Sequence, residues 1–551
     1  MKSRISYFDA AVFKKNLTRF SPCWGIYTVC LTLIVFSSFE HNVDAAGRIL
    51  MAQAASHSVL LLFLVPLLTQ LLFGDLLYNS RMCKALHALP PRRETWFFTN
   101  VASGYAMFLI PVVTTALLTA VFLWLTGYPG TLAVAPLWLA NMLLNFTCLF
   151  GISIFVAFLV GKRTAHWVVY YLLNISPVLL YGLLEELYAP HFFGIKIDVD
   201  AFTNFSPAIR FGSDLFLDIQ QDSLDLTGDI YYRTAKVVDT KVILPGENFG
   251  YCFLAAAVGL ALILGALWLY RRRKLECAGD FIAVQGIKPV FALVYTLTVA
   301  VLFYSAFEGW FLLVGLVMGW FTALMLLERT GRVFNKKNFL RGGILIGTFL
   351  LTLLAAKVDV LGIESWVPET EKVASVRIYK GHYLVEEGEE LLLLTSPEDL
   401  ETVIGIHEDC LQNQGKEGII LTISYQMESG RTVNRYYYVR GEENLRHLTR
   451  WLSTPAQIFG EELTETEFLE QNQYVKVRTE STQARKTVAD QEALRELYQA
   501  ILLDCEEGNM ASIVNQYRDR VQLYLLEFEN GDKLAVFANC VHTLQWIRTH
   551  Q

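Results

Sequence analysis

Residues 132–160 read LAVAPLWLANMLLNFTCLFGISIFVAFLV, a stretch without one charged side chain. A helix of about 20 apolar residues covers the roughly 30 Å hydrocarbon core of a bilayer, so this stretch predicts a transmembrane helix. Inside lipid the backbone amides need internal hydrogen bonds, which a helix supplies. A single run of this kind also fits a buried helix of a water-soluble protein, so the number of such runs decides the fold class.

Eight further apolar runs of similar length occur in the chain. Nine runs in series do not fit the interior of a soluble protein, and the sequence therefore predicts an all-α polytopic membrane bundle of about nine transmembrane helices. The spans that begin near Lys288 and Gly309 are joined by very few residues, which leaves the count open by one. The nine predicted spans begin near Ser21, His57, Phe98, Leu132, Ala165, Gly250, Lys288, Gly309 and Gly342.

The composition divides the chain into two physically different parts. The whole chain is 53% hydrophobic and 18% charged, against about 25% charged residues in a typical soluble protein. Residues 363–551 hold 18 Lys and Arg against 32 Asp and Glu, a net charge of −14, whereas the rest of the chain has a net charge of +7. Neither part indicates a nucleic-acid partner, because one part is acidic and the other keeps its basic residues near the ends of the spans.

Basic residues mark every second connection between the predicted spans. By the positive-inside rule these connections face the cytoplasm. The rule predicts a multi-pass protein of the plasma membrane with a cytoplasmic N-terminus and, after nine crossings, an extracytoplasmic C-terminal domain. The basic residues are Lys2, Arg4, Lys14, Lys15 and Arg19 before span one, Arg81, Lys84, Arg92 and Arg93 after span two, Lys162 and Arg163 after span four, Arg271, Arg272, Arg273 and Lys274 after span six, and Arg329, Arg332, Lys336, Lys337 and Arg341 after span eight.

The predicted domain organisation follows from these patterns. The pattern of the C-terminal region predicts an α+β domain with an internal duplication, because a strand, a helix and a hairpin recur in the same order. Cys410 and Cys505 fall at nearly equivalent places in the two copies, which favours buried core residues over a disulfide. The predicted parts are a cytoplasmic amphipathic helix (1–20), spans one to five (21–187), an extracytoplasmic loop or cap (188–249), spans six to nine (250–362) and the extracytoplasmic α+β domain (363–551, with subdomains at about 363–455 and 465–551).

The sequence lacks the motifs that would indicate chemistry within this chain. It has no Gly-x-x-x-x-Gly-Lys-Ser/Thr phosphate loop, no His-Glu-x-x-His zinc motif and no Gly-x-Ser-x-Gly nucleophile elbow. We therefore expect no catalytic residues, no metal site and no cofactor of its own.

Polar residues within the predicted spans are few, and such residues are costly in lipid and often functional. Asn141 and Asn145 are four residues apart on span four and share one face, and Asp75 lies near the inner end of span two. We interpret Asn141, Asn145 and Asp75 as candidates for a translocation path. The alternatives are hydrogen bonding between neighbouring helices for the asparagines and snorkelling to the interface for the aspartate.

Two Gly-x-x-x-Gly pairs occur in spans eight and nine, at Gly315 and Gly319 and at Gly343 and Gly347. Small residues four apart permit close approach of another helix. The motif is common by chance in membrane helices, so it predicts packing only weakly.

The connection between spans two and three is the best candidate for a functional surface. It reads NSRMCKALHALPPRRETWFFT over residues 79–99, and predicts a short helix at Arg81–Leu89 that two prolines terminate. Its apolar residues are predicted on one side, which suggests docking of a soluble partner; a basic linker on lipid headgroups is the alternative. The candidate docking residues are Arg81, Met82, Leu86, Leu89, Pro90, Arg92, Arg93 and Glu94.

The run ALHALPPRRE at residues 85–94, leading into the span that contains Gly104, resembles the permease subunits of ABC-2-type ATP-binding-cassette transporters. It is most similar to the multi-span permeases of Gram-positive bacteria linked to acetoin use, which have a Leu-His-Ser-Leu-Pro-type stretch at this place. Here Ala88 stands where that stretch has Ser. The resemblance covers spans one to six, and the later spans and the acidic domain exceed the basic six-helix unit.

The resemblance implies a permease without its own nucleotide site, acting as an exporter in the bilayer. A separate ABC ATPase subunit would dock on Arg81–Glu94, so ATP would act only through that partner, and a second permease subunit, identical or different, would complete the transporter. The alternative, which the size of residues 363–551 motivates, is a membrane-anchored extracytoplasmic sensor or scaffold protein. The transported compound is not indicated by the sequence.

Overall fold

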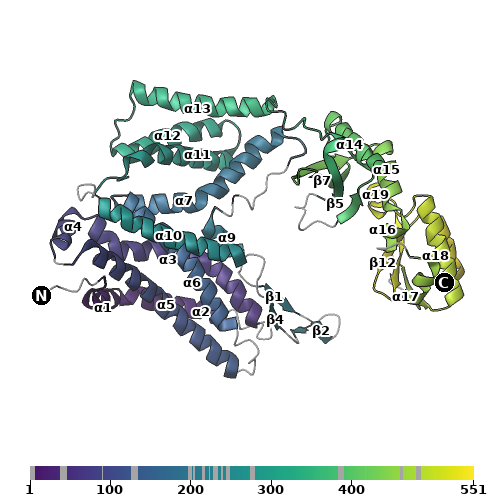
Figure 1. Cartoon of the computed structure of the whole chain (residues 1–551), viewed down its shortest axis with the longest axis horizontal. Coiled ribbons are helices and arrows are strands. Elements are labelled where there is room, and N and C mark those ends of the chain that lie inside the picture. The colour runs from purple at the N-terminus through teal and green to yellow at the C-terminus, as the bar shows by residue number, and fades with distance from the viewer. Residues whose placement is uncertain are drawn as a thin grey trace. The chain divides into compact units, whose positions relative to one another are not determined.

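The computed structural model is mostly helical and contains two compact units (Figure 1). One unit comprises Met1–Leu183 and Val199–Leu350, and the other comprises Leu184–Asp198 and Leu351–Gln551. The structure describes residues 7–550 except 38–45, 90, 126–133, 196–201, 203–204, 214–217, 222–223, 228–233, 238–239, 244–248, 274–278, 382–389, 416, 460–462 and 480–484.

The first unit, here called the helical unit, is a bundle of long apolar helices with two small two-stranded sheets, β1-β4 and β2-β3. Its elements are α1 (Ala10–Arg19), α2 (Ser21–Ser37), α3 (Ala46–Leu77), α4 (Ser80–His87), α5 (Arg93–Leu125), α6 (Val134–Leu159), α7 (Arg163–Leu183), α9 (Pro207–Ser213), β1 (Asp218–Gln221), β2 (Leu224–Thr227), β3 (Thr234–Val237), β4 (Thr240–Ile243), α10 (Phe249–Arg272), η6 (Gln285–Ile287), α11 (Lys288–Phe307), α12 (Phe311–Glu328) and α13 (Lys336–Lys357), the last of which continues into the second unit.

Among the described residues, eight helices are individually long and apolar enough to cross a bilayer. Span one, predicted to begin near Ser21, corresponds to α2, which has 17 residues and bends by 58° from α1; counting the bent pair as one span brings the number to nine. The chain is therefore compatible with a multi-pass membrane protein. The eight segments are Leu60–Leu77, Arg93–Phe122, Ala135–Leu159, Arg163–His191, Gly250–Arg272, Gln285–Phe307, Phe311–Glu328 and Lys336–Lys357.

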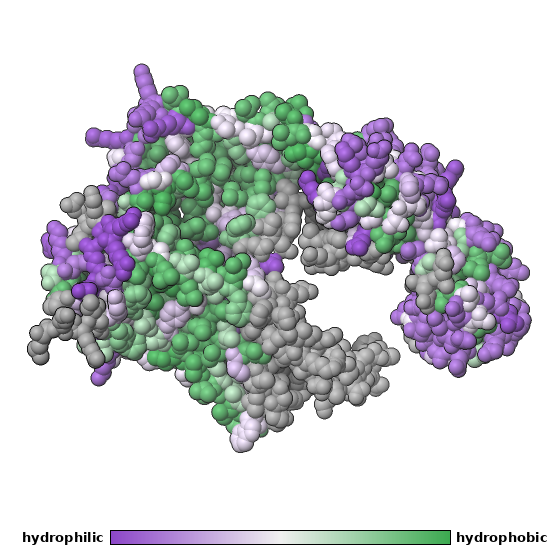
Figure 2. Space-filling model, viewed as in Figure 1, coloured by the Kyte–Doolittle hydropathy of each residue, from purple (hydrophilic) through white to green (hydrophobic). Residues whose placement is uncertain are grey.

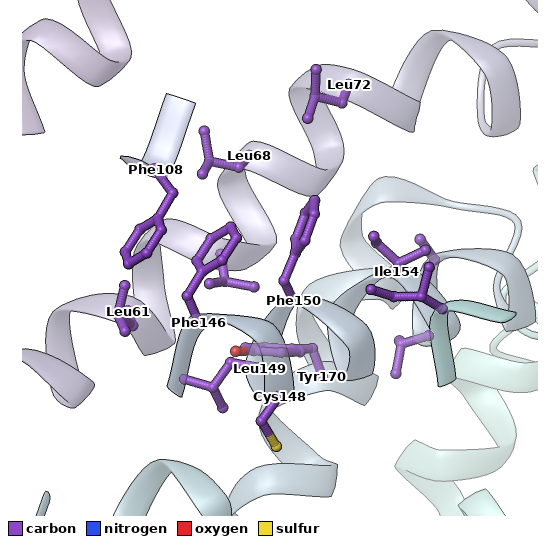
Figure 3. Packing of buried hydrophobic residues seen from close by; sticks show 14 of the residues in the cluster. Leu61, Leu68, Leu72, Phe108, Phe146, Cys148, Leu149, Phe150, Ile154 and Tyr170 are labelled. Carbon is purple, nitrogen blue, oxygen red and sulfur yellow. The ribbon is translucent and has the colours of Figure 1, made fainter. Parts of the chain in front are cut away.

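Helix α6 lies at the centre of the helical unit and forms most of the uncharged stretch at residues 132–160. Of its segment Ala135–Leu159, 78% is buried, against 11% for α13. Phe108 of α5 stacks on Phe146 with ring centroids 4.0 Å apart, and Phe150 continues this aromatic column (Figure 3). The surface of the unit is broadly hydrophobic, with hydrophilic residues gathered at the helix ends near α1 and α4 (Figure 2).

Helices α6 and α10 cross with their backbones in close contact. A Cβ added to Gly151 would lie 2.2 Å from the carbonyl oxygen of Gly259, and a Cβ added to Gly259 would lie 2.5 Å from the carbonyl oxygen of Thr147. Only glycine fits at either position, because any side chain would overlap the facing backbone.

The second unit, here called the sheet unit, contains two four-stranded antiparallel sheets with strand orders β6-β5-β7-β8 and β10-β9-β11-β12. Along the chain, α14 lies between the second and third strands of the first sheet, and α18 and the short α19 lie there in the second sheet; α15 and α20 follow the fourth strands. The elements are η3 (Leu184–Tyr188), η4 (Ala189–His191), η7 (Thr370–Lys372), β5 (Val373–Lys380), β6 (Glu390–Leu394), α14 (Pro397–Gln412), β7 (Ile419–Met427), β8 (Thr432–Val439), α15 (Glu442–Leu452), α16 (Pro455–Phe459), α17 (Glu465–Gln471), β9 (Val475–Thr479), β10 (Arg485–Val488), α18 (Gln491–Glu506), α19 (Ser512–Tyr517), β11 (Gln522–Phe528), β12 (Lys533–Phe537) and α20 (Val541–His550).

The shared topology of the two sheets is compatible with an internal duplication. Each sheet covers its own hydrophobic core. Cys410 and Cys505 are both buried, with 4% and 6% of their surface exposed, and both are free thiols, as predicted. Burial raises the pKa of each thiol to about 12, so neither is suited to act as a nucleophile.

The boundary of the predicted outer cap differs from the structure. Residues 184–198 belong to the sheet unit, because the backbone N–H of Tyr436 in β8 donates to the carbonyl of Gly194 at 2.9 Å. Phe193 packs on Tyr437 beside this bond, with ring centroids 5.6 Å apart. Backbone pairing over such a sequence separation leaves no local pattern, and the prediction therefore assigned this segment to the loop.

Candidate functional site

Helix α4 is a short helix outside the spans, and local sequence accounts for its start. The Asn79 side chain accepts hydrogen bonds from the backbone N–H groups of Arg81 at 3.1 Å and Met82 at 3.3 Å, which caps the first turn. Cys83 faces inward with 3% of its surface exposed, and burial raises the pKa of its thiol. The helix therefore has an inner face fixed to the bundle and an outer face.

The outer face of α4 and the residues after it are apolar and basic. Met82 is 41% exposed and Leu89 is 48% exposed, and the basic residues Arg81, Lys84 and Arg92 are exposed as well. Leu86 differs from the prediction that it shares a side with Met82 and Leu89, because it packs partly buried against the core of the bundle. Pro90 lies outside the described residues.

His87, at the end of α4, connects this helix to α10. Its Nδ1 lies 2.7 Å from the carbonyl oxygen of Cys83, which can only accept, so Nδ1 carries the hydrogen. Its Nε2 then accepts from the hydroxyl of Tyr270 at 2.8 Å. The two rings also make an edge contact, with centroids 5.7 Å apart.

Arg93, at the start of α5, holds the C-terminal end of α10. Its guanidinium donates to the carbonyl oxygens of Tyr270 at 3.1 Å, Arg271 at 3.4 Å and Arg273 at 3.3 Å. These are carbonyls that a helix leaves unpaired at its end, where a cation is also favoured by the helix dipole. The neighbouring Glu94 pairs with Arg271 at 3.1 Å.

Arg273 extends the same arrangement to two more helices. It donates to the carbonyl oxygen of Phe158 in α6 at 3.0 Å and to that of Leu77 in α3 at 3.4 Å. The sequence identified Arg273 only as one of a basic cluster, since its partners lie more than 100 residues away. Through His87, Arg93 and Arg273, the region around α4 is joined to the ends of α3, α5, α6 and α10.

Asp75 lies apart from the two asparagines with which it was grouped. It pairs with Arg19 at 3.6 Å and with Arg163 at 3.4 Å, at the end of the bundle where α6 passes into α7. Asn145 lies 14 residues before the end of α6, about 20 Å away along the helix. The structure therefore assigns Asp75 to the charged helix ends, because there a carboxylate finds cationic partners.

Asn141 and Asn145 are both fully buried. None of the four polar atoms of these two side chains has a hydrogen-bond partner among the described residues, and the same holds for Nε1 of Trp138 one turn earlier on α6. A buried amide without partners costs roughly 1–3 kcal/mol. This face of α6 therefore carries five buried polar side-chain atoms that have no partner among the described residues.

A buried histidine that the sequence analysis did not single out lies within α7. His166 has no exposed surface; its Nε2 lies 3.1 Å from Ser153 Oγ, and its Nδ1 lies 3.3 Å from Gln70 Nε2. Ser153 in turn donates to Thr69 at 2.8 Å. The signal available in the sequence was a histidine inside a predicted span, which is itself unusual.

One group of described residues has side chains that could ligate a metal, and it lies in the sheet unit. Asp504, Glu507 and His542 place one ligand atom each within 4.8 Å of one another. The Asp504 carboxylate already accepts from the backbone N–H and the hydroxyl of Thr543 at 2.8 and 2.7 Å, and so caps α20. A structural role accounts for this group without a metal.

Comparisons with protein-family models, with curated proteins and with solved structures found no match to this chain.

Proposed function

We propose that this chain is the permease subunit of an ATP-driven membrane transporter of the ABC-2 type, acting as an exporter. The observation that carries the proposal is the construction of α4. It presents an exposed apolar and basic face, its His87 contacts Tyr270 of α10, and the neighbouring Arg93 and Arg273 join the ends of α3, α5, α6 and α10. A partner that pushes on this face would move those helices together, which is what coupling to an ATPase requires.

The unpaired asparagines on α6 support a path through the bundle. A conformation in which Asn141 and Asn145 gain partners, from water or a transported molecule, would relieve the cost of burying them here. A protein that merely anchors an outer domain gains nothing from this strain. We therefore retain both residues, without Asp75, as candidates for lining the path.

The orientation belongs to the same proposal. We place the N-terminus and α4 in the cytoplasm and the sheet unit outside the plasma membrane, since basic residues gather at the helix ends near α4. Because the chain carries no phosphate loop, ATP would be bound by a separate subunit docked on α4. A second permease subunit would complete the transporter.

Co-purification of the full-length protein with its ATPase tests the proposal. Met82→Asp and Arg81→Glu change the exposed face of α4 and should abolish association with the ATPase while the protein still folds. Leu86 is unsuitable, because Asp at this position would disturb the core. Lys337→Glu, an exposed basic residue at the start of α13, is the matched control and should leave association intact. If no ATPase co-purifies with the unmodified chain, or if all three variants behave alike, the proposal is wrong.

The sheet unit favours a second candidate function, that of a membrane-anchored sensor or scaffold. Its two sheet domains, each with its own core, are large enough to bind a ligand or a partner protein. ATP-dependent movement of a solute in vesicles that contain the ATPase would exclude a purely sensory role. Ligand binding without any transport would favour it.

A further inference from the structure

A cleft lies between the two sheet domains of the sheet unit. Its volume is about 660 Å³, within the range of small-molecule sites. One wall is a face of α15, and the other is formed by the end of α18 and by the segment that follows α19. The walls touch where Gly508, with φ +74°, meets Thr449, since a Cβ on Gly508 would lie 2.8 Å from Thr449 Cγ2.

Four arginines line this cleft, within a domain whose net charge is strongly negative. They are Arg446, Arg450, Arg518 and Arg520. Arg446 is exposed and makes no hydrogen bond or ion pair with any residue in the described part of the chain, and Arg450 makes only a loose pair with Glu398 at 3.8 Å. A guanidinium left free in a concave site is available for a ligand.

Of the three carboxylates on the cleft walls, two already have cationic or hydrogen-bonding partners. Glu442 pairs with Arg518, and Glu507 lies 3.1 Å from Nε2 of His542. Glu506 is exposed. Among the described residues, none of the three carboxylates forms an ion pair with Arg446.

An independent observation comes from Ser453, at the end of α15. It lines the cleft with 3% of its surface exposed, and its hydroxyl has no hydrogen-bond partner among the described residues. Ser453 follows Arg446 by seven residues, so the two lie on one face of α15, about 10 Å apart along its axis. A buried hydroxyl without a partner is uncommon in folded proteins and points to a group that is bound there.

We propose that this cleft binds a small molecule through a phosphate or carboxylate group. The planar guanidinium of Arg446 would hold two oxygens of the anion, as arginine does with both groups, and the hydroxyl of Ser453 would donate to the same molecule. Because both sheet domains contribute walls, the bound molecule would fix their relative position. The inference does not depend on the transport function proposed above.

Calorimetric titration of the full-length protein in lipid nanodiscs tests this site, with inorganic pyrophosphate and citrate as probes. Binding of pyrophosphate identifies phosphate as the preferred group, and stronger binding of citrate identifies carboxylate. Arg446→Ala should weaken binding of the preferred probe by about ten- to a hundredfold, the effect expected for a lost charge-assisted hydrogen bond. Ser453→Ala should weaken it by about threefold to tenfold.

Arg548→Ala is the matched control, because Arg548 is an exposed arginine of the same domain that does not line the cleft. It should leave both affinities unchanged. The proposal is overturned if neither probe binds at millimolar concentration, or if Arg548→Ala weakens binding as much as Arg446→Ala does, since the attraction would then be unspecific. Circular dichroism of each variant verifies that the loss of binding is not a loss of fold.

Discussion

Three buried asparagines in the helical unit differ in what their side chains contact. Asn100 in α5 donates to the carbonyl of Leu72 at 2.9 Å and accepts from Asn16 at 2.9 Å, so both of its polar atoms are satisfied. Asn141 and Asn145 have no such partners among the described residues. In the sequence these three residues look alike, since each is an asparagine inside an apolar helix. The sequence could not separate them, because the hydrogen-bond partners of a buried amide come from the neighbouring helix.

This difference predicts opposite effects for one substitution. Asn141→Leu and Asn145→Leu should each raise the stability of the protein in detergent by about 1–3 kcal/mol, since each removes a buried unpaired amide. Asn100→Leu should lower the stability by a similar amount, because the carbonyl of Leu72 and the side chain of Asn16 would lose their hydrogen-bond partner. Thermal unfolding checks all three. Equal destabilisation by the three substitutions would show that Asn141 and Asn145 have partners in the native protein.

His407 in the sheet unit predicts a pH dependence. It is fully buried, with Nδ1 3.0 Å from the hydroxyl of Tyr425 and Nε2 2.7 Å from that of Tyr437. Burial, with a smaller contribution from nearby Arg435, lowers its pKa to about 4, whereas an unfolded histidine titrates near 6.5. Between these values the unfolded chain binds a proton that the folded domain excludes, so the domain loses stability as the pH falls.

The loss should develop between about pH 6.5 and pH 4 and reach about 3 kcal/mol. Above pH 6.5 this group contributes no loss, and below pH 4 the loss stays constant because both states are then protonated. The free energy of unfolding of the full-length protein and of His407→Gln, measured across this range, isolates the effect from the carboxylates, which both proteins share. Identical pH profiles for the two proteins would contradict the assignment.

At the scale of the element, some helical glycines lie where another helix leaves no room for a side chain, and others lie where a side chain would fit. The pair Gly315 and Gly319 packs against α11, where added Cβ atoms would lie 2.7 and 2.9 Å from backbone atoms. The second motif, Gly343 and Gly347 in α13, has nothing within 4 Å. The same spacing thus predicts a close helix contact correctly once and wrongly once among the described residues.

The close crossing of α6 and α10 is formed by Gly151 and Gly259, which no motif indicated because they lie on different helices. Gly259→Ala should destabilise the protein by about 1–3 kcal/mol, since the methyl group would overlap the backbone of α6. Gly347→Ala is the matched control and should change stability by less than about 1 kcal/mol, in the stabilising direction, because alanine favours the helix. Thermal unfolding in detergent compares the two, and equal midpoints would show that α6 and α10 are farther apart.

Secondary structure was predictable wherever a local pattern specifies it. The strand, helix and hairpin predicted to recur in the C-terminal region are present as β5, α14 and β7–β8 and again as β9, α18 and β11–β12, since alternation and helical periodicity are local signals. The short strands β6 and β10 were not predicted, because each is defined by pairing with β5 or β9. The contacts of Arg93 and Arg273 were missed for the same reason: the sequence shows their charge, and the fold supplies their partners.

For the whole molecule, the number of membrane crossings decides on which side each terminus lies. If α1 and α2 together cross the membrane once, the nine crossings put the two termini on opposite sides. We predict that alkaline phosphatase fused to the C-terminus is active in intact cells and that green fluorescent protein fused there is not fluorescent. Alkaline phosphatase becomes active after export in the unfolded state, whereas green fluorescent protein exported in this way does not become fluorescent. The same reporters fused after Arg332, between α12 and α13, should give the reverse result. A fluorescent C-terminal fusion would contradict the placement of α4 in the cytoplasm, because seven of the candidate spans separate α4 from the C-terminus.

The backbone bond from Tyr436 to Gly194 occupies the outer side of β8, which is the last strand of its sheet. A strand at this position otherwise offers unpaired amides to any other extended chain. A shortened protein that starts after α13 would lack residues 184–198, and the outer edge of β8 would then be unpaired. Such a fragment should self-associate through the exposed edge of β8. A version of the sheet unit suitable for crystallisation therefore needs the segment around Gly194 in the same polypeptide.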